Sequence, residues 1–441
     1  MKWVFLLAVL MLAPALAGML RSNPRYLVHT CFALGVTIFV LGPKLWTAPI
    51  AWPGWPGPVK GTEVSFVDAI AVALIASTRS VRIPGTIKIA FAIYCLAIII
   101  STFAAYQPMA AIFYAWQLLR TAVLMVAIAR VCVTEPRAPV ALLAGLGVGV
   151  MFESALVVKQ YLSGRDRPGG NLDTANFLGL AADFAVFTNL SLMLGTRRLW
   201  WPAATLAAGF LIAVLGGSRA TSGLFAIGVI LTTILSLQHK KASRKYAFAG
   251  ALALLLVAAV PVLLWAGSRR TEESKISSDA ERAAMKSAAR MIIADHPLGV
   301  GANQYVVVAN TGGYSARAGV AWNEDSRAAP VHDTYYLITA ELGFLGLIGL
   351  LAMLASFIGL GVRTLRRHLP DESGELVPGL LATMILVAVH INFEFVFMNF
   401  ILHDLFAISA GLLIAIASRA TNRSKQPVRP VLHAEPLAQV S

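Results

Sequence analysis

Residues 334–362 read TYYLITAELGFLGLIGLLAMLASFIGLGV and contain one charged side chain, that of Glu341. A helix needs roughly 20 predominantly apolar residues to cross the hydrocarbon core of a membrane, so this stretch is long enough. Similar stretches recur from end to end of the chain. Hydrophobic residues make up 58% of it and charged residues 13%, against roughly 25% charged in a soluble domain. The sequence therefore predicts an all-α, polytopic membrane protein.

About 12 or 13 transmembrane helices are expected. The apolar stretches lie at 3–20, 27–42, 64–78, 87–105, 110–133, 138–160, 176–195, 199–216, 219–237, 246–266, 334–362, 377–399 and 402–418. They divide the chain into N-terminal transmembrane helices (1–160), a transmembrane core (161–266), a long non-cytoplasmic loop that contains helices (267–333), C-terminal transmembrane helices (334–418) and a cytoplasmic basic tail (419–441).

The first twenty residues fit two interpretations. Lys2, the apolar run after it and Ala15-Leu16-Ala17 are typical of a cleavable signal peptide. A retained first helix is the interpretation that we favour, because multispanning proteins seldom need a cleaved leader.

The net charge of +14 follows a pattern along the chain. Basic residues occupy every second connection between the predicted helices: Arg21 and Arg25; Arg79, Arg82 and Lys88; Arg130 and Arg137; Arg197 and Arg198; Lys240, Lys241, Arg244 and Lys245; Arg363, Arg366 and Arg367; and Arg419, Arg423, Lys425 and Arg429. By the positive-inside rule these connections face the cytoplasm. Membrane orientation thus explains the charge, and nucleic acid is not an expected partner.

Residues that bind metals or cofactors show no familiar spacing. Cys31, Cys95 and Cys132 lie in or beside apolar runs without CxxC spacing, so neither a disulfide framework nor a zinc site is indicated. The histidines lack ligand patterns such as HExxH, and we find no Walker loop or dinucleotide fingerprint. We therefore expect no metal and no cofactor, so that any energy used arrives in the substrate.

The long loop carries a helix signal of its own. Ser278-Asp279-Ala280-Glu281 fits a capping box, and apolar residues then recur at helical spacing, which predicts a helix over about 278–295. On this helix Arg282, Lys286 and Arg290 follow one another at intervals of four and share one face.

Ionisable residues inside apolar stretches are costly and therefore candidates for function. They are Arg120, Glu153, Asp183, Glu341 and Glu394. Opposite signs among the first three also fit structural pairs that bridge helices. Glu394 has His390 one turn before it and His403 and Asp404 after it, which fits either a site or a hydrogen-bonded helix pair.

Cations on the predicted outer face point to an anionic substrate. They comprise Arg165 and Arg167 in a short loop, Arg219 after Gly216-Gly217-Ser218, and the stripe of Arg282, Lys286 and Arg290. Arginine binds phosphate bidentately and keeps its charge, and a helix N-terminus such as that beside Arg219 also favours an anion. For any one of them a surface salt bridge is the simpler interpretation; as a set they favour a phosphate ligand.

His332 stands where the long loop re-enters the membrane, in Val331-His332-Asp333-Thr334. A histidine exchanges protons near neutral pH, which makes it a candidate for acid–base chemistry. A lone histidine is more often structural.

Four segments, taken in order, resemble the O-antigen ligase and polymerase superfamily of membrane glycosyltransferases. They are Arg167-Pro168-Gly169-Gly170 with Asn176-Phe177-Leu178-Gly179; Ser218-Arg219 with Gly223; Arg282 followed by Asp295-His296-Pro297-Leu298-Gly299-Val300-Gly301; and His332-Asp333-Thr334-Tyr335 with Glu341-Leu342-Gly343-Phe344-Leu345-Gly346. The resemblance covers roughly residues 160–400. Two positions depart from the family pattern: Asp333 replaces the usual Asn, and Lys286 replaces a common aromatic residue, which adds a possible phosphate contact.

The resemblance implies a metal-independent transfer on the periplasmic face of the bacterial inner membrane. The donor would be a glycan on undecaprenyl diphosphate, and the acceptor a sugar on lipid A core (ligase) or on a second lipid-linked glycan (polymerase). Arg219 and Arg282 would be catalytic ligands of the diphosphate, together with Arg167 and, as weaker candidates, Arg290, Lys286 and Arg165. His332 would serve the acceptor as general base or positioning residue.

Four alternatives to a ligase stay open. Ligase is slightly favoured over polymerase. The two differ in their acceptor, which is recognised by loop surfaces for which no sequence pattern is known. The stretch from His390 to Glu394, with Glu394 as a substrate-binding candidate, resembles a terminal segment of protein O-oligosaccharyltransferases. From other classes, a lipid or polysaccharide transporter would show inverted repeats with broken helices, which we do not find in the sequence, and a non-catalytic assembly subunit would tolerate loss of His332.

Overall fold

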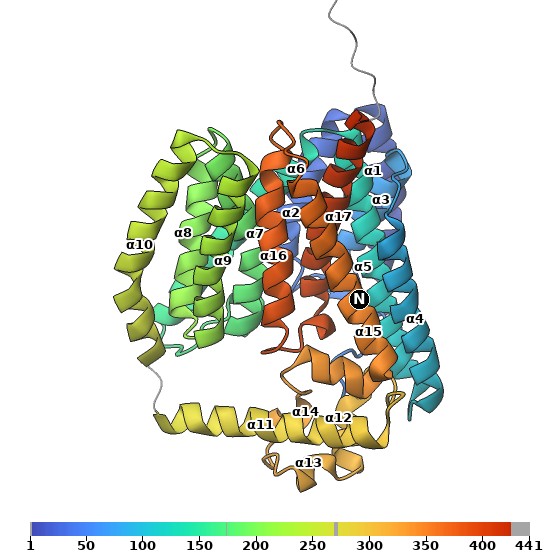
Figure 1. Ribbon diagram of the computed structural model, residues 1–441. Helices are drawn as coiled ribbons and strands as arrows, with labels where there is room; N and C mark the ends of the chain where they lie inside the picture. The colour runs from blue at the N-terminus through green and yellow to red at the C-terminus, as the bar shows by residue number, and fades with distance from the viewer. Residues whose placement is uncertain (1, 173, 269–271, 425–441) are drawn as a thin grey trace, which may run out of the picture.

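The computed structural model describes residues 2–172, 174–268 and 272–424, and these are mostly helical. Long helices stand side by side in a bundle, and α11 with several short helices lies across one end of it (Figure 1). Among the described residues, nine helices are long and apolar enough to cross a membrane, and further apolar helices are shorter. The predicted fold class, a polytopic all-α membrane protein, is confirmed.

The bundle helices coincide with the predicted apolar stretches. In chain order they are α1 (Lys2–Ser22), α2 (Arg25–Val40), α3 (Phe66–Ser77), α4 (Gly85–Ala104), α5 (Pro108–Thr134), α6 (Ala138–Leu162), α7 (Ala175–Gly195), α8 (Trp200–Leu215), α9 (Arg219–His239), α10 (Ser243–Ser268), α15 (Thr334–Leu365), α16 (Val377–His390) and α17 (Phe400–Ser424). Short 3₁₀ turns η1 (Gly170–Leu172), η2 (Gly374–Leu376) and η3 (Val396–Met398) lie in the connections. The antiparallel strands β1 (Trp46–Thr47) and β2 (Val64–Ser65) pair between α2 and α3.

One predicted helix is too long. The stretch 377–399 was expected to be helical throughout, but α16 ends at His390 and Glu394 lies in the loop before η3. The start of α15 holds this loop: the Thr334 amide donates to the Ile391 carbonyl (2.7 Å), and the Thr334 hydroxyl donates to the Glu394 carbonyl (2.6 Å). Hydropathy does not reveal such a contact, because it depends on a residue about sixty positions away.

The long connection between α10 and α15 contains four helices: α11 (Glu272–Asp295), α12 (Tyr305–Thr311), α13 (Tyr314–Arg317) and α14 (Glu324–Ala328). The predicted helix over 278–295 ends where expected but begins already at Glu272. Ser278 is therefore inside α11, and its assignment to a capping box was wrong.

A glycine-rich turn after α11 docks onto a kink in α15. Gly343 has φ of 67° within α15, a left-handed conformation that glycine adopts without steric cost. Here the Gly301 amide donates to the Glu341 carbonyl (2.9 Å). A Cβ on Gly299 would lie 2.4 Å from that same carbonyl oxygen, so the backbones approach too closely for a side chain. This contact fixes the end of α11 against the membrane helices.

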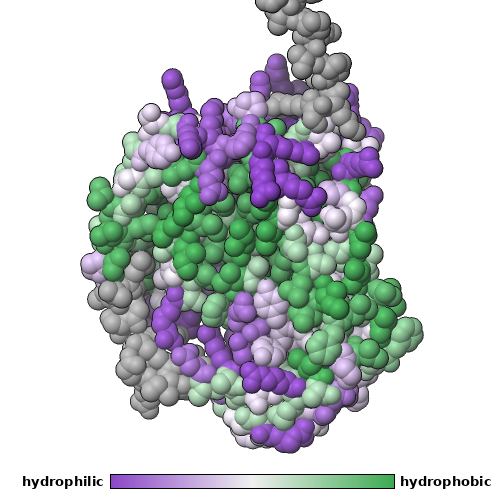
Figure 2. Space-filling model, viewed as in Figure 1, coloured by the Kyte–Doolittle hydropathy of each residue, from purple (hydrophilic) through white to green (hydrophobic). Residues whose placement is uncertain are grey.

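Basic connections gather at one end of the bundle, the upper end in Figure 2, where hydrophilic side chains border the apolar band. Arg21 donates to the Ala76 carbonyl (2.7 Å), Arg130 to the Arg79 carbonyl (3.1 Å), and Arg367 to Thr421 (2.8 Å), so these connections contact one another. Residues 425–441 of the predicted basic tail lie outside the described residues. The helices α11 to α14 lie at the opposite end (Figure 1).

Candidate active site

A cavity of about 360 Å³ lies where α11 and α14 cover the end of the bundle opposite the basic connections. Its wall combines the α6–α7 connection, the start of α7, α11, α14, the entry to α15 and the loop after α16. Four predicted site residues line it: Arg167, Arg282, His332 and Glu394. Hydrophilic side chains are visible below the apolar band at this level of the molecule (Figure 2).

His332 and Glu394 form a hydrogen-bonded pair in the cavity wall. Nδ1 of His332 lies 3.1 Å from Oε2 of Glu394. Because an ionised carboxylate only accepts hydrogen bonds, Nδ1 carries the proton of a neutral imidazole and Nε2 is left as the acceptor. Phe395 packs beside the ring, with 5.1 Å between centroids. The arrangement suits a histidine whose orientation and tautomer are set by a carboxylate.

Glu394 also connects the two arginines of the cavity. Its Oε1 accepts a short hydrogen bond from the Asn176 side chain and lies 3.8 Å from Nη2 of Arg282. The Asn176 oxygen in turn accepts from Arg167 (3.3 Å). A chain of polar contacts thus crosses the cavity from Arg167 through Asn176 and Glu394 to Arg282. His332 contacts the same Glu394.

The ionisation of Glu394 follows from these partners. Burial alone would raise the pKa of this carboxyl, since only 5% of the side chain is exposed. Hydrogen bonds with His332 and Asn176 and the charge of Arg282 outweigh burial and hold the pKa below its usual value. Glu394 is therefore a carboxylate at neutral pH, as the histidine tautomer above requires.

The two departures from the family pattern contact each other. Nζ of Lys286 lies 2.8 Å from Oδ2 of Asp333, whose side chain is 3% exposed. The other oxygen of Asp333 accepts from the amides of Tyr335 (3.0 Å) and Tyr336 (3.2 Å) and so caps α15. The two residues that depart from the resembled pattern thus form an ion pair.

The remaining predicted cations lie outside the cavity wall. Arg219 begins α9 and pairs with Asp279 of α11 at 3.2 Å, where both side chains are about half exposed. Asp279 precedes Arg282 by three residues on α11, which places Arg219 beside the cavity. Arg165 is exposed in the α6–α7 connection, and Arg290 lines a different cavity on the far side of Lys286.

The structural pairs expected among Arg120, Glu153 and Asp183 do not form. Nε of Arg120 lies 2.7 Å from Oδ1 of Asp68, and Nη1 lies 4.0 Å from Oε2 of Glu63. Glu153 instead accepts from the Asn171 amide (2.9 Å), and Asp183 is buried in α7. The partners of Arg120 come from the α2–α3 connection and the start of α3, because α3 and α5 pack together.

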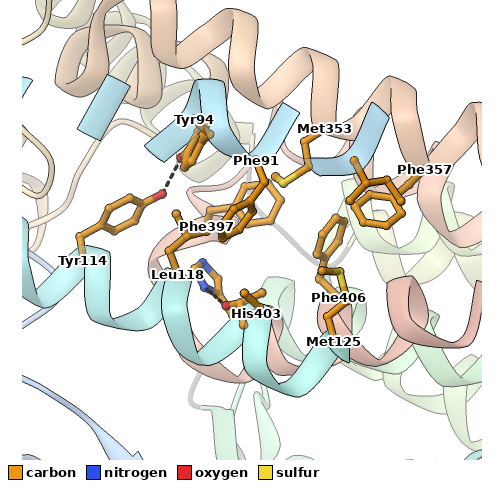
Figure 3. Close-up of a pocket in the computed structure, with 13 residues that line it drawn as sticks. Phe91, Tyr94, Tyr114, Leu118, Met125, Met353, Phe357, Phe397, His403 and Phe406 are labelled. Carbon is orange, nitrogen blue, oxygen red and sulfur yellow. Dashed lines mark hydrogen bonds between the residues drawn. The ribbon is translucent and has the colours of Figure 1, made fainter. Parts of the chain in front are cut away.

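The other buried histidines do not join Glu394. His390 is buried at the end of α16. His403 lies inside the bundle at a closed cavity of about 30 Å³, where its Nδ1 is 2.9 Å from the Thr121 hydroxyl (Figure 3). Tyr94 and Tyr114 hydrogen-bond across the same cavity at 2.6 Å. Within the described residues, the histidine that hydrogen-bonds with Glu394 is thus the distant His332 and neither of these two histidines.

Glu341 has a structural role. Its two carboxylate oxygens accept from the amides of Asn303 (2.8 Å) and Tyr305 (2.9 Å). The Asn303 side chain donates onward to the Val59 carbonyl (2.7 Å). Glu341 thereby ties the loop helices to α15 and to the α2–α3 connection.

Three amide or carboxyl side chains of the cavity were not among the predicted site residues: Asn176, Glu281 and Asp325. Asn176 had a detectable signal, since it is a polar residue in the first turn of an apolar helix and part of a recognised motif. Glu281 and Asp325 had none, because acidic residues are common on exposed loop helices. In the part of the chain that is described, no group of three or more His, Cys, Asp or Glu side chains is arranged to hold a metal ion.

The fold and the cavity define a class: a multi-pass, all-helical membrane protein with an arginine- and histidine-lined cavity at one end of its bundle. Residues 204–351 match the family described as O-Antigen ligase. The matched segment is about a third of the chain, and it agrees with the resemblance to the O-antigen ligase and polymerase superfamily that the motifs indicated. The matched segment includes Arg219, Arg282 and His332 but not Arg167 or Glu394. No curated protein sequence matches the chain.

Proposed function

We propose that the protein is a glycosyltransferase that moves a glycan from an undecaprenyl-diphosphate carrier to a sugar acceptor on the periplasmic face of the bacterial inner membrane. The observation that carries this proposal is the convergence of Arg167, Arg282, His332 and Glu394 around one cavity. The cavity lies at the end opposite the basic connections, and the positive-inside rule directs that end away from the cytoplasm.

The arginines suit the diphosphate of the donor. Arg282 and Arg167 line the cavity, and Arg219 lies beside it at the N-terminus of α9. As the bond between the anomeric carbon and the diphosphate oxygen breaks, negative charge develops on the leaving diphosphate. Fixed guanidinium groups stabilise that charge in the transition state without further reorganisation. Arg282 would exchange its 3.8 Å contact with Glu394 for the phosphate.

His332 suits the acceptor. Its Nδ1–H is directed to Glu394, so Nε2 can take the proton of an acceptor hydroxyl. The hydroxyl oxygen then bonds to the anomeric carbon, the diphosphate leaves with the bonding electron pair, and the proton stays on His332. Glu394 stabilises the imidazolium that results. No metal is needed for this sequence of events.

We propose a ligase, with a polymerase as the second candidate. Purified protein is given a lipid-linked glycan donor together with either lipid A core or a second lipid-linked glycan, and product size is measured. A single shift on the core identifies a ligase, and a ladder of lengths identifies a polymerase. Transfer to a protein acceptor alone would support protein O-glycosylation instead.

Arg219→Ala and His332→Ala should each abolish transfer while expression and membrane insertion stay normal. Asp279→Ala is the matched control for the arginine, because it breaks the same salt bridge but leaves the cation in place. If both variants retained normal polysaccharide in cells, the catalytic assignment would be wrong. Loss of transfer in Asp279→Ala equal to that in Arg219→Ala would show that Arg219 acts only by holding α11.

A further inference from the structure

A second cavity, of about 490 Å³, lies between α11 and α15 on the other side of Lys286. Its lining includes Arg290, Ile293, Pro297, Tyr336, Phe344 and Leu347. Apart from the guanidinium and the tyrosine hydroxyls, most of this surface is apolar. It therefore differs from the first cavity, where acidic and basic side chains alternate.

Arg290 is held differently from the other cations of its stripe. Within the described residues, Arg282 and Lys286 each have a carboxylate partner, Glu394 and Asp333, whereas Arg290 contacts Tyr336. Its guanidinium lies 5.4 Å from the Tyr336 ring centroid, and its Nε donates to the Tyr336 hydroxyl at 3.2 Å. A guanidinium that stacks on a ring keeps its charge and its terminal N–H donors for an anion.

Exposed apolar side chains border this cavity. Phe344 follows the kink in α15 and is 53% exposed, and Ile348 one turn further is 55% exposed. Leu298, in the turn that docks on the kink, is 69% exposed. Large apolar side chains exposed on a spanning helix contact lipid, so an acyl or alkyl chain can reach the cavity from the bilayer.

We propose that this cavity seats the acceptor when that acceptor is an anionic, lipid-anchored glycan, with its chain against Phe344 and Leu347 and its phosphate on Arg290. This inference rests on the proposed function. Arg282 and Arg290 are eight residues apart, about 12 Å along the helix at 1.5 Å per residue. The two cavities thus lie side by side, with the Lys286–Asp333 pair between them and His332 next to Asp333. An acceptor whose phosphate binds Arg290 can extend its glycan past the Lys286–Asp333 pair to His332. The donor diphosphate binds Arg282 at the same time.

The test compares two soluble probes with the purified protein in lipid nanodiscs. One is a disaccharide carrying an alkyl phosphate at its reducing end, and the other is the same disaccharide phosphate without the alkyl chain. The wild-type protein should use the alkyl phosphate with a KM at least tenfold lower. Arg290→Gln and Leu347→Asn should each raise that KM about tenfold and change kcat less than twofold. Leu347→Asn should leave the chain-free probe unaffected, whereas Arg290→Gln should raise the KM of that probe as well, because both probes carry the phosphate.

Arg317→Gln is the matched control, since Arg317 also stacks on a tyrosine, Tyr314 at 4.6 Å, but lies away from both cavities. It should leave both KM values unchanged. Equal KM values for the two probes in the wild type, or an unchanged KM in Arg290→Gln, would overturn the proposal.

A measurement of equilibrium binding tests this proposal independently of the proposed function. If the wild type transferred no glycan to any acceptor, the function would fail, but equilibrium binding of the alkyl phosphate probe would still be measurable. Loss of that binding in Arg290→Gln, with binding of a polyprenyl diphosphate retained, supports a seat for the acceptor lipid. Loss of both ligands together would contradict two separate sites.

Discussion

Arg120 in α5 and Arg282 in α11 both pair with carboxylates, but the surroundings of the two pairs differ. Arg120 is 5% exposed, contacts Asp68 at 2.7 Å and lines none of the cavities described above. Arg282 is 32% exposed, lies 3.8 Å from Glu394 and lines a cavity of about 360 Å³. The first pair is tight and closed, whereas the second is loose and open to a ligand. In this membrane protein, a charged residue that lines a cavity is therefore a candidate for function. A charged residue that is only buried is better explained by a structural role.

Arg282→Ala should lower activity strongly, as should Arg219→Ala and His332→Ala. It removes a cavity guanidinium from the developing charge of the leaving group, and the loss of one such donor usually lowers turnover about 100-fold or more. The measurement is the transfer rate of purified protein with saturating acceptor. Arg317→Ala serves as the control on an exposed part of the same connection. A variant that retained more than half of the wild-type rate would contradict the role of Arg282.

Arg120→Leu should give the largest effect on stability. It leaves Asp68 and Glu63 without their cation, and breaking a buried ion pair usually costs about 3–5 kcal/mol. The measurement is the thermal unfolding midpoint in a fixed detergent. Arg198→Gln is the matched control, because its contact with Glu372 is about half exposed and should contribute at most about 1 kcal/mol. Equal midpoints for the two variants would show that the Arg120 pair is not structural.

Lys286 and Asp333 should show energetic coupling. Lys286→Phe alone leaves a nearly buried carboxylate unpaired, and Asp333→Asn alone leaves the lysine unpaired. The double variant restores the residue types of the family pattern and should recover most of the lost stability. A double-mutant cycle on the unfolding midpoint measures the coupling, which is expected to be about 1–3 kcal/mol. Additive effects would mean that the two departures are independent.

Glu394→Gln should give the smallest of these effects on stability, and the size of this effect depends on pH. The pKa of Glu394 is lowered in the fold, so its ionisation stabilises the protein above the ordinary carboxyl pKa, and that contribution is lost as the pH falls through the lowered pKa. Gln does not titrate. Acidification from pH 6 should therefore lower the unfolding midpoint less in this variant than in the wild type. An equal or larger fall in the variant would contradict the sign of the pKa shift.

The sequence was sufficient to predict the helices and four side chains of the cavity wall. Apolar length predicted the bundle, and motifs predicted that Arg167, Arg282 and His332 belong together. Partners were harder to predict, because they depend on how each helix is rotated against its neighbours. Glu394 had only its sequence neighbours, such as His390, as candidate partners, but it contacts His332, which is 62 positions away. Pairing of Arg120 with Glu153 or Asp183 was one open interpretation, and Arg120 pairs with Asp68 instead. Apolar periodicity carries no information on such contacts.

The most direct test compares His332→Ala with Arg120→Leu in one preparation, measuring the transfer rate per folded molecule together with the unfolding midpoint. We predict that His332→Ala loses transfer at least 100-fold with an unchanged midpoint, as expected for a lost general base. Arg120→Leu should keep its transfer rate per folded molecule and lose stability. A His332→Ala protein that transfers glycan normally, or a stable but inactive Arg120→Leu protein, would contradict the account.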